Sequence, residues 1–383
     1  MLPFDFQLQT RIVFGPDTIE KLGELASEMG ARRALVVSDP GVIAAGHTRH
    51  GLDALQRAGI EAHLFERVHE NPTTDDVDAG VAFTKRHDPE VLVGLGGGSS
   101  LDCAKGINFL YSNGGQMQDY WGVGKALKPM LPMIAVPTTA GTGSETQSFA
   151  LISDAKTHAK MACGDKKASC RIAILDPKLT VTQPPRVTAL TGIDAIAHAL
   201  ETYVTKRRNP VSLLYSCEAW RLLAANFGRV LEDPTDIDAR AAMQLGASYA
   251  GVAIENSMLG ATHALANPLT ATYGIVHGEA IGMMLPHVIR FNGEQYESWY
   301  EELLEASSNG NGMPKASSGP DGLADFVTEL VAKAGLATRL PDCRVEEAKL
   351  PDLAAAAATQ WTGTFNPREV DEPELLNLYE RAF

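Results

Sequence analysis

The sequence predicts an α/β domain followed by an all-α domain. In the first half of the chain, short apolar runs alternate with segments of helical periodicity, which is typical of a parallel sheet covered by helices. Two glycine-rich turns each follow such an apolar run directly. After Asp176-Pro177 the strand-like runs stop, and one helical pattern follows another. These observations favour a doubly wound sheet in the first half and helices alone in the second.

The first half reads as strands and helices in turn. The runs at 33–37 and 90–95 are almost wholly apolar, as in central parallel strands that are buried on both faces. Strands are expected at 7–14, 33–37, 62–65, 90–95, 133–136 and 172–175. Helices are expected at 18–29, 52–59, 75–86 and 101–110.

The second half reads as helices. Pro184 and Pro185 cannot continue a helix, so we expect domains at 1–182 and 183–383. Residues 307–322 have low complexity and predict a loop without a catalytic role. Helices are expected at 187–204, 211–230, 236–255, 262–269, 280–289, 297–306, 323–334 and 354–361.

Composition excludes several classes of protein. With 45% hydrophobic and 21% charged residues in 383, the chain is neither disordered nor a membrane protein, and no apolar run approaches a membrane span. A net charge of −14 would repel nucleic acid and anionic lipid. The five cysteines are scattered, and the start of the sequence lacks the pattern of a secretory signal, so a cytoplasmic location is expected.

The two glycine-rich turns, residues 94–102 and 137–145, predict a dinucleotide site. Both place backbone N–H groups at the carboxyl end of a strand, where phosphate binds in such sheets. The alternative is that they are glycine-rich for steric reasons only. The usual fingerprint is absent, because Ser99 stands where its third glycine would be. Asp39 could accept hydrogen bonds from a ribose and would repel a 2′-phosphate, which favours NAD over NADP; alternatively it is a turn aspartate before Pro40.

One carboxylate and three imidazoles predict a metal site. Asp194 and His198 are four residues apart in a helical run, so both project from one face. His263 and His277 lie in small-residue surroundings further on. The set suits Fe(II), Zn(II), Co(II) or Ni(II), although a single such helical pair often occurs by chance.

Together these motifs resemble the iron-containing alcohol dehydrogenase family, which shares its fold with glycerol dehydrogenase and dehydroquinate synthase. The resemblance rests on 96–99 with Asp102, 137–142, 174–177, 192–198, 260–264, 277–278 and 366–368, over nearly the whole chain. It implies one divalent metal, held by the quartet in a cleft between the domains. Iron(II) is the expected ion, with zinc, manganese and nickel as alternatives. Family members are usually homodimers or larger, pairing through the strand near 11–14.

The resemblance also assigns a cofactor site and a catalytic position. It implies that NAD contacts Asp39, Asn71, Gly97, Gly98, Ser99, Asp102, Thr138, Thr139, Thr142, Phe149, Lys160 and Leu179. The two residues that it assigns to catalysis are the ligand His277 and Asn267. Asn267 stands where the family commonly has a proton-relay histidine. An asparagine cannot titrate near neutral pH. Val276 and Glu255 are further departures that suggest an atypical substrate site.

The predicted function is metal-dependent hydride transfer between NAD(H) and a small alcohol, aldehyde or ketone. The alternative that Asn267 raises is a hydroxyacid-oxoacid transhydrogenase that retains its cofactor. A lyase of the dehydroquinate-synthase type is disfavoured, because the sequence lacks the basic residues that grip a phosphate substrate. The intact quartet argues against an inactive binding protein.

Overall fold

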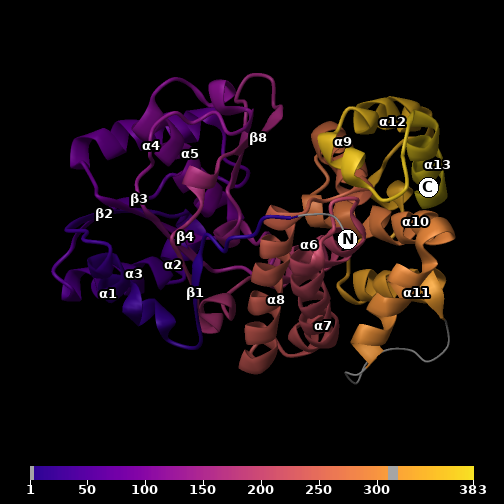
Figure 1. The fold of residues 1–383 in the computed structure, drawn as a ribbon, viewed down its shortest axis with the longest axis horizontal. Helices are drawn as coiled ribbons and strands as arrows, with labels where there is room; N and C mark the ends of the chain where they lie inside the picture. Colours follow the sequence, from indigo (N-terminus) through magenta and orange to yellow (C-terminus); the bar gives the residue numbers. More distant parts are fainter. Residues whose placement is uncertain (1–3, 309–317) are drawn as a thin grey trace. The chain divides into compact units, whose positions relative to one another are not determined.

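The computed structural model describes residues 4–308 and 318–383, and the chain divides into two compact units (Figure 1). One unit comprises Gln7–Gln183 and contains both sheets. The other comprises the described residues of Pro184–Phe383, joined by residues 4–6. Most of the expected loop at 307–322, namely 309–317, lies outside the described residues.

The first unit is built on a six-stranded parallel sheet with the order β1-β9-β6-β4-β2-β3. Its strands are β1 (Arg11–Phe14), β2 (Arg33–Val37), β3 (Glu61–Phe65), β4 (Val91–Gly96), β6 (Met133–Pro137) and β9 (Ile172–Leu175). The chain adds β3 on one side of β2 and β4 on the other. The strand order therefore switches between β2 and β4, and ligands bind at the carboxyl ends of strands beside such a switch.

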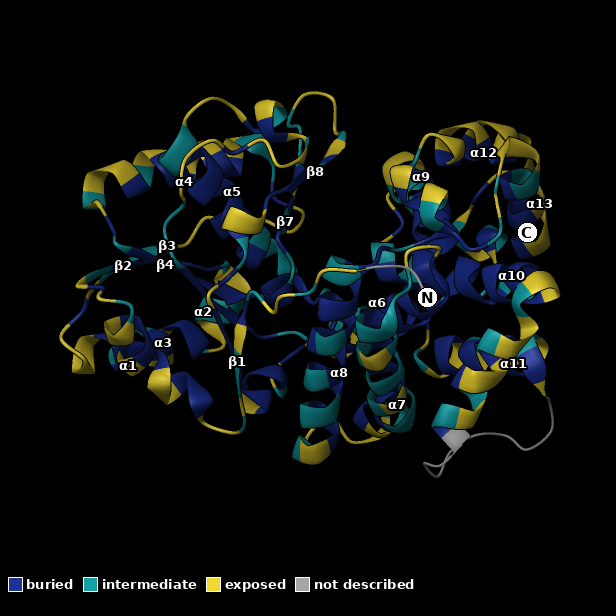
Figure 2. Cartoon of the chain, viewed as in Figure 1, coloured by how far each residue is buried: buried dark blue, intermediate teal, exposed yellow. Residues whose placement is uncertain are grey.

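Helices cover both faces of this sheet. On one face lie α4 (Thr74–His87) and α5 (Gly98–Asn113), and on the other α1 (Leu22–Glu28) and α3 (His47–Arg57) (Figure 1). Each face has its own core cluster: Leu35 and Leu92 belong to one, and Val36 and Val93 to the other. Because side chains alternate along a strand, wholly apolar strands supply both cores. Figure 2 shows α5 mostly buried and the outer sides of α1 and α4 exposed.

A second, three-stranded sheet was not expected. Its order is β5 (Gly122–Val123), β8 (Lys160–Gly164) and β7 (Phe149–Ser153), and β7 runs antiparallel to β8. The remaining elements of this unit are α2 (Pro40–Ala44), η1 (Thr18–Lys21), η2 (Met117–Tyr120), η3 (Ser144–Thr146), η4 (Lys166–Ala168) and η5 (Pro177–Thr180).

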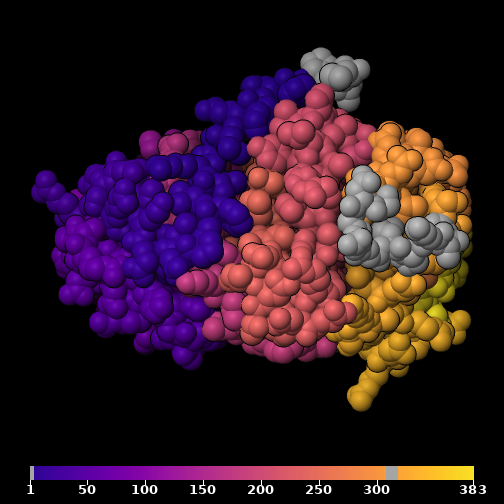
Figure 3. Space-filling view, turned by 90° about the horizontal axis from the view of Figure 1, so that it is seen from below, coloured from indigo at the N-terminus to yellow at the C-terminus, as the bar shows by residue number. Residues whose placement is uncertain are grey.

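The second unit contains helices and connecting loops, with no strand among its described residues. Its α-helices are α6 (Pro185–Val204), α7 (Pro210–Glu232), α8 (Ile237–Asn256), α9 (Ala261–Tyr273), α10 (His277–Ser308), α11 (Gly319–Lys333), α12 (Leu350–Ala358) and α13 (Glu372–Ala382). Short 3-10 turns occur at η6 (Leu340–Cys343), η7 (Glu347–Lys349) and η8 (Trp361–Phe365). Helices α7 and α8 lie side by side, and their atoms form a continuous face of the unit (Figures 1 and 3).

Two of the expected helices are confirmed as separate helical segments on either side of a kink. The segments 280–289 and 297–306 both belong to α10, which has a kink at Tyr296, where φ is −126° and ψ is 37°. The acidic segment 369–374 contains the start of α13, where Asp371 accepts a hydrogen bond from the backbone N–H of Glu374. Within 4–308 and 318–383, no helix combines the length and the apolar character needed to span a bilayer.

Candidate metal centre and cofactor loops

Three imidazoles, each from a different helix, converge on one carboxylate oxygen of Asp194. Asp194 and His198 belong to α6, His263 to α9, and His277 is the first residue of α10. The Oδ1 atom of Asp194 lies 3.3 Å from Nε2 of His198, 3.5 Å from Nε2 of His263 and 3.7 Å from Nε2 of His277. All four residues of the predicted quartet are therefore brought together.

The ligand atoms of Asp194, His263 and His277 all lie within 4.8 Å of one another, and His198 joins them through its contact with Asp194 on the same helix. With metal–ligand bonds of about 2.1 Å, ligand atoms on a tetrahedral edge are about 3.4 Å apart. Oδ1 of Asp194 and Nε2 of His263 are buried, and neither has a hydrogen-bond partner within the part of the chain that the structure describes. Buried polar atoms are normally paired, so this pair of atoms is suited to ligating a cation. The mixed nitrogen and oxygen set matches a divalent transition metal.

Two glycines let the helices approach closely enough to form this site. A Cβ atom on Gly278 would lie 2.2 Å from the carbonyl oxygen of Leu190 on α6. A Cβ atom on Gly192 would lie 2.2 Å from the ring of Phe227 on α7. Any larger residue at 278 would push the start of α10 away from α6, and with it His277.

The sequence reasoning missed Glu201, a carboxylate behind the site. Glu201 accepts a hydrogen bond from Nδ1 of His263, which leaves Nε2 of that ring to face Asp194. Its other oxygen accepts from the backbone N–H of Thr262 at 2.7 Å, at the start of α9. Glu201 follows Asp194 by seven residues, and that helical spacing was the available signal. A carboxylate behind a ligating histidine fixes its tautomer and orientation.

The protonation equilibria of the carboxylates and imidazoles in this site are coupled to one another. Burial alone would raise the pKa of Asp194, but the imidazoles of His198, His263 and His277 outweigh it and lower that pKa. Burial would lower the pKa of His263, but the carboxylates of Glu201 and Asp194 have the larger effect and raise this pKa to about 9.

The site can be reached from the side of His277. The side chain of His277 is 27% exposed, against 9% for Asp194. Asn267 lies one turn after His263 on α9, and its amide nitrogen donates a hydrogen bond to Oε1 of Gln360 at 3.0 Å. Val276 is exposed just before α10. Glu255 is half-buried near the end of α8.

In the α/β unit, Asp39 contacts the first glycine-rich turn. Ser100 donates a hydrogen bond to Oδ2 of Asp39 at 2.9 Å, and a Cβ atom on Gly96 would lie 2.9 Å from the same oxygen. Gly96 has a φ of +153°, which L side chains rarely adopt. The other oxygen of Asp39 accepts from the backbone N–H groups of Gly41 and Val42 at the start of α2. Asp39 therefore does cap a turn, as the alternative had it, and it also adjoins the glycine-rich turn.

The two glycine-rich turns lie against each other. A Cβ atom on Gly98 would lie 2.6 Å from Thr142, and one on Gly97 would lie 3.3 Å from Thr139. The backbone N–H of Thr138 donates to the carbonyl of Gly96 at 3.0 Å. On the other side, the N–H of Asn71, whose φ is 53°, donates to Oγ of Ser99 at 3.1 Å. Seven of the predicted cofactor residues thus form one cluster: Asn71, Gly97, Gly98, Ser99, Thr138, Thr139 and Thr142.

A buried lysine that the sequence reasoning missed anchors the second turn. Lys105 is fully buried, and its Nζ donates to the carbonyl oxygens of Ser144, Gln147 and Phe149 at 2.6, 2.8 and 2.9 Å. Beside it, Asp102 accepts a hydrogen bond from Oγ of Ser144 at 2.6 Å. The sequence signal for this buried anchor was a lysine within a helical segment that is otherwise largely apolar.

Three predicted cofactor residues stand on other elements. Phe149 begins β7 and Lys160 begins β8, in the smaller sheet. Leu179 lies in η5 after β9, and its side chain is 3% exposed and belongs to the core cluster beneath α1 and α3.

Comparison with known proteins identifies the family. A model described as iron-containing alcohol dehydrogenase matches residues 9–177, and the C-terminal model of the Fe-containing alcohol dehydrogenase family matches residues 188–383. The chain belongs to the iron-containing alcohol dehydrogenase family.

Individual members of the family resemble the chain over its whole length. The 1,3-propanediol dehydrogenase of Klebsiella pneumoniae is 33% identical over 383 residues, covering 99% of both chains. The NAD-dependent methanol dehydrogenase of Bacillus methanolicus is 31% identical, also covering 99% of both. The crystal structure of a 1,3-propanediol oxidoreductase superimposes with a TM-score of 0.93, at 31% identity and with complete coverage of both chains.

Family membership confirms the predicted fold and the predicted class of reaction. The chain is an NAD-dependent alcohol oxidoreductase, and the transhydrogenase alternative is not favoured. Its parallel sheet and helical half are those of the iron-containing alcohol dehydrogenases. The site found in the helical unit supplies a candidate for the metal of this family.

Proposed function

We propose that this alcohol dehydrogenase binds one iron(II) ion through Asp194, His198, His263 and His277, and uses it to oxidise small primary alcohols and diols with NAD. The observation that carries the proposal is the convergence of three imidazole nitrogens on a buried oxygen of Asp194. When bound, a divalent ion supplies Lewis acidity, which lowers the pKa of an alcohol or polarises the carbonyl of an aldehyde.

The chain's own residues orient the reactants. Glu201 holds His263 through Nδ1 and keeps its Nε2 directed at the site. Asn267 cannot take up the substrate proton, and its hydrogen bond to Gln360 leaves it a positioning role. We propose that the proton instead leaves through water on the exposed side of His277.

We propose that the dinucleotide lies on the two glycine-rich turns. The backbone of Gly97 and Gly98 at the start of α5 would bind the pyrophosphate, because N–H groups and the helix dipole favour an anion there. Asp39 would accept hydrogen bonds from the ribose and reject a 2′-phosphate, which makes NAD the cofactor. Asp102 and Lys105 hold the second turn from behind.

The class of substrate that we propose is based on the substrates named for two relatives. Their names give 1,3-propanediol and methanol as substrates, both small unbranched primary alcohols. A short primary alcohol or diol is the common chemistry.

We also propose a homodimer in the cytoplasm. The β1 strand is at the edge of the six-stranded sheet, and Phe14 at its end is 43% exposed, so a second copy could extend the sheet there. All five cysteines are among the described residues and are free thiols, which suits a reducing compartment.

The test is turnover after metal exchange. Purified protein is stripped of metal, reconstituted separately with Fe(II), Zn(II), Mn(II) and Ni(II), and assayed for NADH formation with short alcohols, diols and hydroxyacids. We expect iron to restore the largest activity with primary alcohols or diols, and NADP to be a poor cofactor. His263→Ala should abolish both metal binding and turnover. Full activity in the metal-free protein, or in His263→Ala, would refute the proposal.

A further inference from the structure

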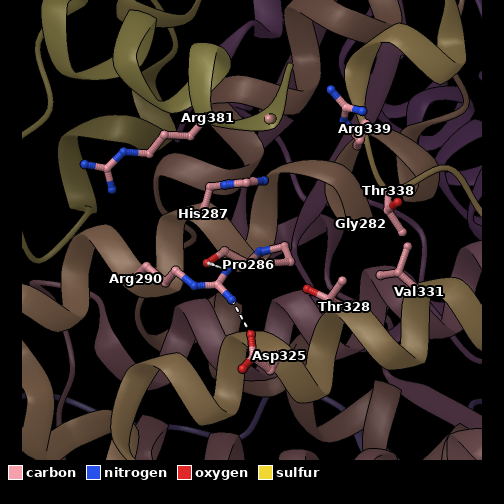
Figure 4. A pocket seen from close by; sticks show the side chains of 11 residues that line it. Gly282, Pro286, His287, Arg290, Asp325, Thr328, Val331, Thr338, Arg339 and Arg381 are labelled. Carbon is pink, nitrogen blue, oxygen red and sulfur yellow. Dashed lines mark hydrogen bonds and ion pairs between the residues drawn. The ribbon is translucent and has the colours of Figure 1, made fainter.

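A hollow of about 300 Å³ lies in the helical unit, among α10, α11, α13 and the segment before η6 (Figure 4). It shares no residue with the metal quartet. Its polar lining comprises His287, Arg290, Asp325, Thr328, Thr338, Arg339 and Arg381. The volume is at the lower end of the range for small-molecule sites.

The lining carries positive charge that the chain does not neutralise. Arg290 forms an ion pair with Asp325 and lies 3.3 Å from a carboxylate oxygen of Asp321. Arg381 is exposed and has neither an ion pair nor a hydrogen bond to the described residues. Arg339 donates to the main-chain oxygen of Phe383 at 2.6 Å and has no carboxylate side chain as partner there. The guanidinium of Arg381 therefore remains available, and that of Arg339 keeps donor groups beyond its bond to Phe383, in a chain of net charge −14.

His287 lies in the hollow beside two arginines. Burial lowers its pKa to about 4, and the positive charges of Arg290 and Arg381 act in the same direction. Its ring is therefore neutral at physiological pH and can donate one N–H. Figure 4 shows His287 between the side chains of Arg381 and Arg290.

The rest of the lining is apolar and small. Gly282, Pro286, Val331 and Ala382 contribute carbon or backbone surface. A bare inorganic ion would leave this surface uncovered, whereas a small organic anion would cover it. Arginine is suited to both carboxylate and phosphate, because its planar N–H groups can bind either in a bidentate manner.

We propose that this hollow is a second ligand site of the enzyme and binds a small organic anion through its phosphate or carboxylate group. Arg381 and Arg339 bind the anionic group, and the ring of His287 donates a further hydrogen bond. The site is independent of the proposed alcohol and NAD sites, since none of its residues belongs to either.

The experiment is calorimetric titration of the metal-loaded enzyme, saturated with NAD so that the glycine-rich turns cannot bind the probes. Glycerol phosphate and malonate serve as phosphate and carboxylate probes, and sodium chloride of equal ionic strength is the blank. The variants are Arg381→Gln and Arg339→Gln. The matched control is Arg221→Gln, which removes an exposed arginine from α7, where it is paired with Glu218.

We expect at least one probe to bind once per chain, and each pocket variant to weaken it by roughly ten-fold or more, the loss expected for a charge-assisted hydrogen bond. Arg221→Gln should bind as the wild type does. Whichever probe binds identifies the anionic group. Melting temperatures verify that each variant is folded, and Arg381→Lys, which keeps the charge, should recover part of the affinity. Absence of binding by both probes, or equal binding by wild type and both pocket variants, would overturn the proposal.

Discussion

Glu201 accepts a hydrogen bond from Nδ1 of His263, and Nε2 of the same ring lies 3.5 Å from Oδ1 of Asp194. The two carboxylates thus hold one imidazole from both sides. Because Glu201 also binds the N–H of Thr262, it fixes the first turn of α9 together with the ring. The orientation of one proposed ligand depends on a residue that does not itself reach the ion.

Replacement of Glu201 should therefore weaken metal binding. For Glu201→Gln we expect affinity for the divalent ion to fall by roughly 10- to 100-fold, the usual effect of removing such a carboxylate. Competition with a chelating dye measures the affinity without an activity assay. The control is Glu301→Gln, which changes an exposed glutamate in α10 of the same unit. Unchanged affinity in Glu201→Gln would show that His263 is held by packing alone.

Introducing a histidine at Asn267 should create a titrating group. Asn267 lies one turn beyond His263 and is partly exposed. A histidine there would ionise near its ordinary pKa of about 6.5. We expect the pH profile of kcat/KM for Asn267→His to gain an ionisation close to that value, which wild type and Asn267→Gln lack. A profile identical to that of wild type would place position 267 outside the path of the proton.

Loss of Lys105 should damage both stability and cofactor binding. In Lys105→Met the carbonyl groups of Ser144, Gln147 and Phe149 lose a buried donor. We expect a loss on the order of 3 kcal/mol in the free energy of unfolding, because unsatisfied buried acceptors cost about 1–3 kcal/mol each. The KM for NAD should rise more than kcat falls. Denaturant unfolding and steady-state kinetics measure the two effects.

The control for that variant is Lys85→Met, which alters an exposed lysine of α4 in the same unit. It should leave both quantities unchanged. A stable Lys105→Met enzyme with the wild-type KM would contradict the role given to this lysine.

His287 should make stability fall in mild acid. Its pKa is lowered by burial and by nearby arginines to about 4 in the folded chain, against about 6.5 when unfolded. Between these values the unfolded chain binds the extra proton, so this contribution is fully present above pH ~6.5 and is lost as pH falls toward ~4. The free energy of unfolding of His287→Gln should decline less than that of wild type over this window. Parallel declines, measured in a buffer without phosphate or carboxylate, would refute this.

The sequence alone predicted those features that depend on a pattern within one helix or strand. The apolar run 33–37 has the character of a strand buried on both faces, and β2 occupies those residues. The spacing of Asp194 and His198 placed both on one face of a helix, and both lie on α6. Each inference needed only the periodicity of one element.

The sequence did not predict features that depend on contact with a residue far away in the chain. A Cβ atom on Gly293 would lie 2.3 Å from Pro320, so this glycine permits close packing by α11. Strands β7 and β8 depend on pairing with each other. Lys105 is a buried charge whose acceptors lie about 40 residues away. Nothing local to these residues reveals such partners.

All four proposed metal ligands come from the helical unit, and every proposed cofactor residue comes from the α/β unit. The proposed residues for metal binding and those for cofactor binding are therefore encoded by separate stretches of the gene. On the proposed assignment, we expect mutations that reshape the surroundings of Asn267 to alter which alcohol is accepted without disturbing coenzyme preference. Diversification of substrate range can then proceed on one half of the chain while the other stays constant.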